Sequence, residues 1–123
     1  MTKQGAQPTL QFVWLEVADL ARAAAFYGET LGFPIVESTD AFIVADLTSA
    51  KLYLAQGQPI PTNIYLAIAV PDIDLLYQRM LEAGLKVASP QDEGWARYIE
   101  YQDPDGYRLL LLTPISQDDE GTA

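Results

Sequence analysis

The chain has 123 residues, neither cysteine nor histidine, and 17 acidic residues against seven basic ones, which gives a formal net charge of −10. That length suits a single domain with a sizeable core, and the missing cysteine excludes disulfides, thiolate chemistry and zinc–cysteine sites. The acidic balance disfavours nucleic acids and anionic membranes as partners and favours cations, unless the acidity serves solubility alone.

The two ends of the chain are predicted to lie outside the folded domain. Residues 1–9 form a short extension with one lysine and no apolar run, so no secretory signal is apparent and a cytoplasmic location is expected. Residues 115–123 are predicted to be an acidic, flexible tail. Leaving out Asp118, Asp119 and Glu120 reduces the excess of acids from ten to seven, because 14 acids then face seven bases.

The first half of the chain begins with a predicted strand of alternating pattern, which starts at Phe12 and ends before Asp19. The carboxylate of Asp19 suits a helix N-cap. An alanine-rich helix is predicted over residues 20–31, with Gly32 directly after it. Three short strands are then predicted at residues 35–36, 42–47 and 51–54.

The second half repeats this order. A strand is predicted to begin at Tyr65, and Asp72 takes the place of the N-cap. A helix is predicted over residues 73–83, and Gly84 ends it. The turn sequence Asp103-Pro104-Asp105-Gly106 separates the last two strands. The three strands of this half are predicted at residues 85–88, 97–101 and 107–113.

One βαβββ unit therefore occurs twice, with an aspartate seven residues after an aromatic residue in each copy. Within a single domain at residues 10–114, module 1 is predicted at 10–56, a proline-containing linker at 57–63, and module 2 at 64–114. One module alone would leave a face of its sheet uncovered, so the two are expected to pair. The predicted fold class is α+β, in which tandem βαβββ modules form a curved mixed sheet around a central cavity and one helix packs behind each module.

Five motifs stand out in the two modules. They are Val17-Ala18-Asp19-Leu20, Phe26-Tyr27, Leu31-Gly32-Phe33, Trp95 and Asp103-Pro104-Asp105-Gly106-Tyr107. Together they resemble the vicinal oxygen chelate superfamily, which includes glyoxalase I, extradiol dioxygenases and bleomycin-resistance proteins, and the metal-free bleomycin-resistance-like proteins are the most similar in kind. The resemblance covers roughly residues 10–114 and implies the tandem-module fold. One departure is Tyr107, since the family usually has asparagine there.

The resemblance also implies where a metal site would lie. In metal-using members a histidine opens the first strand of each module, and acidic ligands come from the last strand of each. In this chain those positions are Phe12, Tyr65, Tyr53 and Leu110. None has an imidazole or a carboxylate, and the two glutamates Glu16 and Glu100 would hold a divalent ion only weakly. No metal and no other cofactor are therefore expected, and metal-dependent glyoxalase or dioxygenase chemistry is not expected.

Strand alternation predicts which side chains face the cavity between the modules. If Val13, Leu15 and Val17 pack under the helix, the residues between them face the other way, and the same parity applies to the other strands. The predicted ligand-binding residues are Phe12, Trp14, Glu16, Tyr53, Tyr65, Trp95, Tyr98, Glu100, Arg108 and Leu110. This set is rich in aromatic rings, which suits a flat organic ligand.

Each of these assignments has a structural alternative. The aromatic rings could simply fill a core. Glu16 needs a partner if it is buried, and that partner is either a ligand or an internal ion pair with Arg108 or Lys51. Trp95 could anchor its own loop, whereas the resemblance to bleomycin-resistance proteins implies that it contacts a ligand.

Three functions from different classes are compatible with these features. The predicted function is a metal-free protein that sequesters a flat aromatic compound, as in antibiotic resistance, with the acids favouring a cationic one and a homodimer forming the groove. The second is a metal-independent lyase, isomerase or hydrolase that uses Glu16 or Glu100 as its general base. The third is a non-catalytic domain that contacts another protein, its cavity closed by Trp14, Tyr65 and Tyr98.

Overall fold

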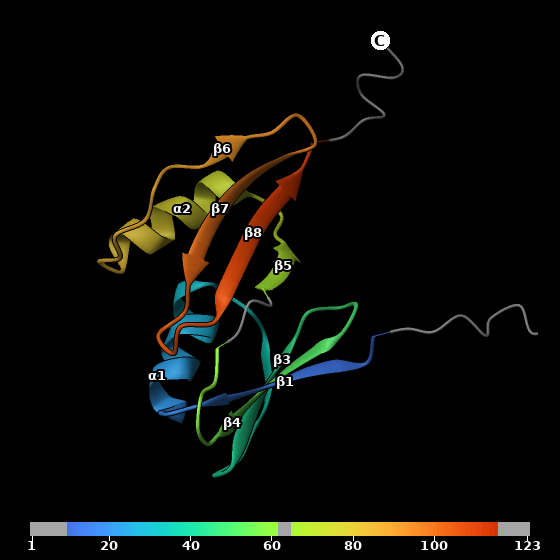
Figure 1. Ribbon diagram of the computed structural model, residues 1–123, viewed down its shortest axis with the longest axis vertical. Coiled ribbons are helices and arrows are strands. Elements are labelled where there is room, and N and C mark those ends of the chain that lie inside the picture. The colour runs from blue at the N-terminus through green and yellow to red at the C-terminus, as the bar shows by residue number, and fades with distance from the viewer. Residues whose placement is uncertain (1–9, 62–64, 116–123) are drawn as a thin grey trace, which may run out of the picture.

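The structure, a computed structural model, describes residues 10–61 and 65–115 and contains two βαβββ modules in tandem (Figure 1). The predicted fold class is confirmed. The N-terminal extension, residues 62–64 of the predicted linker, and residues 116–123 of the predicted tail lie outside the described residues. In the part of the chain that is described, no helix is long and apolar enough to cross a membrane.

Module 1 contains a four-stranded mixed sheet. Strand β1 (Phe12–Val17) runs parallel to β4 (Lys51–Gln56), and β3 (Phe42–Asp46) runs antiparallel to β4. Strand β2 (Ile35–Ser38) pairs with β3, which gives the strand order β1-β4-β3-β2. Ile43 and Ala45 of β3 and Leu52 and Leu54 of β4 pack in the core, and the residues that alternate with them point to the opposite, open face.

Module 2 has the same topology. Strand β5 (Tyr65–Ala69) runs parallel to β8 (Arg108–Pro114), and β7 (Ala96–Gln102) runs antiparallel to β8. The short strand β6 (Gln91–Asp92) pairs with β7, and the order is β5-β8-β7-β6. The second module therefore repeats the first strand for strand, as the sequence predicts.

One predicted element is wrong. Residues 85–88 form no strand, and the strand at this place in the module is β6 instead. The alternation that predicts a strand here comes from Leu85 and Val87, which pack against the core from an irregular segment. Alternate burial of two side chains thus needs no partner strand.

Both helices begin at the predicted aspartates. The carboxylate of Asp19 accepts one backbone N–H at 3.1 Å ahead of α1 (Leu20–Ala24), which continues as the π-helix η1 (Ala25–Thr30). The carboxylate of Asp72 accepts two backbone N–H groups, each at 3.1 Å, at the start of α2 (Ile73–Glu82). These bonds satisfy donors that the first turn of a helix leaves unpaired.

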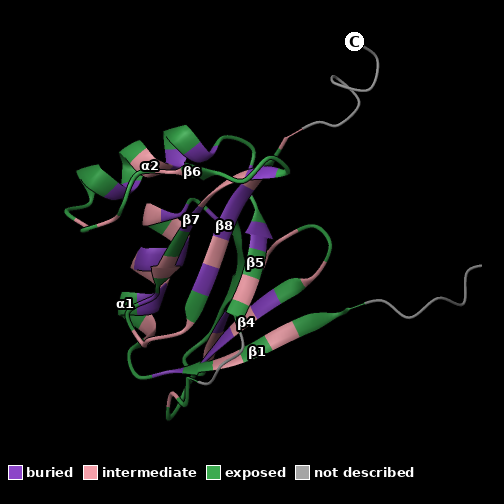
Figure 2. Cartoon of the chain, turned by 45° about the horizontal axis from the view of Figure 1, so that its top comes forward, coloured by how far each residue is buried: buried purple, intermediate pink, exposed green. Residues whose placement is uncertain are grey.

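The helical segment of module 1 packs against module 2 as well as against its own sheet, so the modules share one core (Figure 2). The ring of Phe26 stacks on that of Tyr101, with 6.1 Å between centroids. The hydroxyl of Tyr27 donates to Oδ2 of Asp103 at 2.5 Å. Burial raises the pKa of both Tyr27 and Asp103, because the charged form of each would lose its hydration.

Within the described ranges each sheet has two edge strands that pair on one side only, β1 and β2 in module 1 and β5 and β6 in module 2. No ladder of hydrogen bonds joins the two sheets in that part of the chain. Unpaired backbone groups at such an edge favour the addition of another strand. The tandem modules are thus two separate four-stranded sheets, held together through α1 and η1.

Candidate functional site

The open face of the module 1 sheet carries four aromatic rings, those of Phe12, Trp14, Phe42 and Tyr53, which we call the aromatic face. Tyr53 lies at its centre, with ring centroids 5.0 Å from Phe12, 5.6 Å from Trp14 and 5.6 Å from Phe42. The rings of Trp14 and Tyr53 are stacked, at an interplanar angle of 18°. Phe12 is 51% exposed and Trp14 is 49% exposed. Two large rings therefore remain available to a ligand.

Strand parity accounts for this face. Val13, Leu15 and Val17 of β1 pack against the core, so Phe12 and Trp14 must point to the other side. The aromatic face thus contains three of the predicted ligand-binding residues.

The fourth ring, that of Phe42, is missing from the predicted set. Its neighbour Ile43 is buried and packs in the core, so the parity of β3 turns Phe42 to the open face. The same parity argument, applied to this strand, would have found it from the sequence.

Glu16 occupies the third outward position of β1, and its carboxylate has a backbone partner. Its Oε1 accepts the backbone N–H of Gln58 at 3.0 Å, where the chain leaves β4. The predicted ion pair with Arg108 or Lys51 is wrong: Lys51 pairs with Asp46 at 3.6 Å, and Arg108 has no ion pair among the described residues. The sequence could not reveal this partner, because it is a backbone group.

The open face of module 2 contains a pocket of about 480 Å³, which we call the module 2 pocket. Its lining residues are Tyr65, Glu100, Tyr101, Gln102, Arg108, Leu109 and Leu110. Four of them, Tyr65, Glu100, Arg108 and Leu110, belong to the predicted ligand-binding set. The guanidinium carbon of Arg108 lies 5.6 Å from the centre of the Tyr65 ring. No residue of module 1 lines this pocket, so the predicted residues fall on two separate surfaces.

The last two predicted residues lie outside the module 2 pocket. The hydroxyl of Tyr98 is 3.3 Å from carboxamide Oε1 of Gln91 and 3.3 Å from Oε2 of Glu93. Partial desolvation and the nearby Glu93 raise the pKa of Tyr98. Trp95 stands before β7 with 54% of its surface exposed. Its carbonyl accepts the N–H of Ile115 at 2.9 Å.

The positions where the family resemblance places metal ligands match between the modules. Tyr53 lies opposite Trp14 in the β1–β4 register, and Leu110 lies opposite Ala67 in the β5–β8 register. Each is two residues beyond the partner of the strand's opening aromatic residue, Phe12 or Tyr65, so the alignment of Tyr53 with Leu110 is consistent. These side chains do not fit a divalent ion, because none is an imidazole or a carboxylate. In residues 10–61 and 65–115, no three His, Cys, Asp or Glu side chains gather as a metal site would require.

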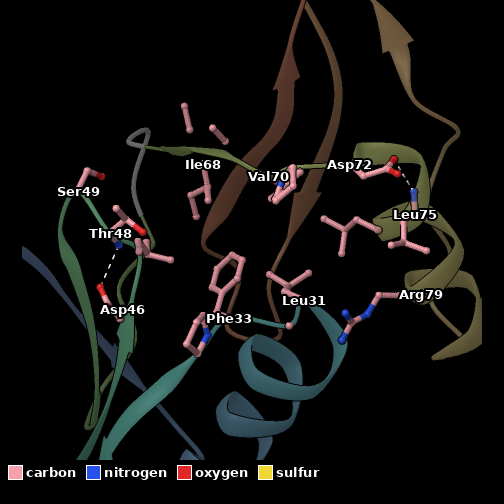
Figure 3. Close-up of a pocket in the computed structure, with 17 residues that line it drawn as sticks. Leu31, Phe33, Asp46, Thr48, Ser49, Ile68, Val70, Asp72, Leu75 and Arg79 are labelled. Atoms are coloured by element: carbon pink, nitrogen blue, oxygen red, sulfur yellow. Dashed lines mark hydrogen bonds between the residues drawn. The ribbon is translucent and has the colours of Figure 1, made fainter.

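A cavity of about 550 Å³ lies at the junction of the modules (Figure 3). It is lined by residues 31–34 after η1, 46–49 between β3 and β4, and 67–72 from β5 to the start of α2. Consecutive residues of β5 line it, so the open edge of this strand borders the cavity. Arg79 also lines it, and its guanidinium donates to the carbonyl of Glu29 at 2.8 Å. None of the predicted ligand-binding residues is present here.

The two-module topology agrees with a comparison of the sequence with known families. Residues 9–111 match the Glyoxalase/Bleomycin resistance protein/Dioxygenase superfamily. The chain belongs to this superfamily, which confirms the resemblance seen in its motifs. No curated protein matches the chain.

Solved structures share the fold. TnmS3, an antibiotic-binding protein from Streptomyces sp. CB03234, is 25% identical, with a TM-score of 0.75 over 89% of this chain and 98% of that one. A protein described as a conserved domain protein is 23% identical, with a TM-score of 0.76 over 88% and 100% of the two chains. The oxidase ChaP-H2 is 21% identical, with a TM-score of 0.73 over 88% and 94%. The last two show the fold alone.

Proposed function

We propose that this protein binds a flat aromatic compound without a metal and protects by sequestering it. The observation that carries the proposal is the aromatic face, where Phe12 and Trp14 are each about half exposed beside Tyr53. Exposed apolar surface of this kind is typical of binding sites. A ring inserted against such a face gains about 0.5–1.5 kcal/mol per aromatic pair beyond its buried area.

The family comparison supports a small-molecule ligand. TnmS3 is described as an antibiotic-binding protein, and its match covers 89% of this chain and 98% of TnmS3. Sequestration needs affinity and no catalytic group, which suits a surface of rings. The acidic chain attracts cations at long range, so a planar cation is one expected kind of ligand.

We expect a second copy of the chain to complete the groove. Within the described residues β1 and β5 each leave one edge unpaired, and the junction cavity borders the β5 edge. Pairing β1 of each copy with β5 of the other would satisfy both edges with two-fold symmetry. The aromatic face of one copy would then lie beside the module 2 pocket of its partner. Light scattering at micromolar concentration should give the mass of a dimer, and a monomer would contradict this arrangement.

The absence of a metal is tested separately. The four family positions offer no imidazole or carboxylate, so binding should not depend on a divalent ion. Elemental analysis of the purified protein should find no stoichiometric metal. Affinity for a bound aromatic compound should be unchanged by EDTA, whereas a loss of binding on chelation would contradict the proposal.

The binding itself is tested by tryptophan fluorescence. Trp14 and Trp95 are the two tryptophans of the chain, and both are exposed. A panel of planar compounds of positive, neutral and mixed charge, metal-free bleomycin among them, should include one that changes the emission and saturates at one ligand per chain. Trp14→Phe should remove most of the change, and Trp95→Phe serves as the matched control. A flat response across the panel would contradict sequestration.

Metal-independent catalysis is the second candidate function. Glu100 favours it, because this carboxylate and Arg108 line the same pocket, where one could accept a proton and the other could stabilise negative charge. Glu16 is a weaker base candidate, since Gln58 occupies its carboxylate. Turnover of a bound compound that is lost in Glu100→Gln would replace the sequestration proposal with this one.

A further inference from the structure

The module 2 pocket contains one acid and one base that do not neutralise each other. Glu100 and Arg108 are the only charged residues among the described ones that line it. Arg108 lies opposite Gln102 in the β7–β8 register and Glu100 lies opposite Leu110, so the two charges are diagonal neighbours on one face. Diagonal positions are separated by about 7–8 Å. Neither side chain forms a hydrogen bond or an ion pair with another described residue.

Arg108 differs in this from the other three arginines of the chain. Arg22 pairs with Asp105 at 2.9 Å, Arg97 pairs with Asp74 at 2.9 Å, and Arg79 donates to a backbone carbonyl. Of the four arginines, Arg108 alone has no oxygen partner among the described residues, which include 14 of the 17 acids. No residue in 10–61 or 65–115 occupies its N–H groups, which can therefore bind an oxygen of a ligand.

The ring of Tyr65 holds this guanidinium in place. The 5.6 Å distance from the guanidinium carbon to the ring centre lies within the range of a cation–π contact. Such a contact uses the face of the guanidinium and leaves its edge, with the N–H donors, available. The guanidinium is therefore preorganised for binding, which reduces the entropy cost of ordering the side chain when a ligand binds.

We propose that this pocket recognises a mixed polar group on the aromatic ligand: an acceptor oxygen that Arg108 binds, beside an N–H or ammonium donor that Glu100 binds. The proposal rests on the proposed function and names the chemistry of its ligand. A purely cationic head group would be repelled by Arg108, and a purely anionic one by Glu100. A group with both properties, such as the amino and carboxylate groups of an aromatic amino acid, satisfies both residues. The pocket volume of about 480 Å³ lies within the range of small-molecule sites.

Three probes that share one ring system test this proposal by calorimetric titration of the full chain. They are 3-(2-naphthyl)alanine, 2-(2-naphthyl)ethylamine, which lacks the carboxylate, and 3-(2-naphthyl)propionate, which lacks the amine. The amino acid should bind about tenfold or more tightly than either of the others, because each truncated probe leaves one charged residue without a partner.

Two substitutions should change the preference in opposite directions. Arg108→Gln should remove the advantage of the amino acid over the amine, since no cation then repels the amine. Glu100→Gln should remove its advantage over the propionate. Lys86→Gln and Glu82→Gln make the same changes of charge at exposed positions outside this pocket and should preserve the wild-type order.

The outcomes separate this inference from the proposed function. Equal binding of the three probes, or an order that neither substitution changes, would overturn the inference while sequestration of aromatic compounds stands. Failure of all three probes, when larger planar compounds still bind, would also overturn it. Failure of every aromatic compound would overturn both proposals.

Discussion

The two modules have one backbone plan and two different open faces. Their strand orders and registers match, yet equivalent positions hold Phe12 and Tyr65, Tyr53 and Leu110, Lys51 and Arg108. Module 1 presents stacked rings. Module 2 presents a polar pocket in which Arg108 has no ion pair among the described residues. The core-facing residues of both modules pack in one shared core, so they must fit each other, whereas the open faces lie outside that core. They can therefore differ and divide the binding of a ligand between them.

The equivalent bases show this division most clearly. Lys51 pairs with Asp46 at 3.6 Å, both at least 40% exposed, so this ion pair adds little to stability. Arg108 has a ring in place of an acid. Module 1 thus pairs its base with an acid, whereas the equivalent base of module 2 has no ion pair among the described residues.

The contact between Tyr27 and Asp103, which we call the joint between the modules, should be where a substitution lowers the free energy of unfolding most. Tyr27 is fully buried between α1–η1 and the β7–β8 turn, so Tyr27→Ala should lower the free energy of unfolding by about 3–5 kcal/mol. Urea denaturation measures this loss. Tyr77→Ala on the partly buried face of α2 is the matched control and should cost clearly less. An equal cost for both would show that the joint holds no special share of the stability.

High pH should weaken the same joint. Burial raises the folded-state pKa of Tyr27 well above the ordinary value of 10.0, so the unfolded chain releases this proton first. The stability from Tyr27 is complete below pH 10 and is lost as the pH rises beyond it, by about 1.4 kcal/mol per pH unit. Denaturation midpoints from pH 9 to 11 (roughly one unit on either side of that value) should fall in this way. Tyr27→Phe should flatten the dependence, and an unchanged slope would contradict this assignment.

Removing one ring of the aromatic face should weaken ligand binding while leaving the free energy of unfolding nearly unchanged. Trp14→Ala should weaken binding of an aromatic ligand by about tenfold, because a stacking partner is lost. Its effect on unfolding should be small, since half of the side chain is already exposed. Leu75→Ala, at an exposed position of α2 away from the aromatic face, should change neither quantity. Calorimetry reports the affinity, and unchanged binding would remove Trp14 from the site.

The two helix caps offer the smallest and most direct comparison of the modules. Asp72 accepts two backbone N–H groups and Asp19 accepts one. Each change to alanine should cost about 1 kcal/mol of unfolding free energy. Asp72→Ala should cost the more of the two, because it leaves two donors unpaired. The reverse order in thermal or urea denaturation would show that hydrogen-bond number does not decide the cost.

The sequence predicts the fold well and the site only in part. The helix caps at Asp19 and Asp72 and the inward and outward positions of β1 follow from local sequence patterns. Such patterns determine local backbone structure, so these predictions are confirmed. Strand parity assigns a side chain to a face, but it says nothing of how two sheets lie relative to each other. Parity therefore predicts one cavity that contains both the aromatic face and the module 2 pocket. In a single chain these two surfaces lie apart.

Other features depend on partners that a sequence pattern does not show. The carboxylate of Glu16 binds a backbone N–H of the segment after β4, which has no signature in residue type. The irregular segment at residues 85–88 has the alternating pattern of a strand, because Leu85 and Val87 pack against the core and their neighbours are exposed.

The central claim is that one groove combines the aromatic face of one copy with the module 2 pocket of another. Mixed dimers of Trp14→Ala and Arg108→Gln chains, formed by unfolding and refolding the two together, test it directly. Each mixed dimer would hold one groove with both changes and one with neither, so about a quarter of all grooves should regain wild-type affinity. Titration with an aromatic ligand should reveal this tight fraction, which neither variant shows alone. Its absence from the mixture would contradict a groove shared between copies.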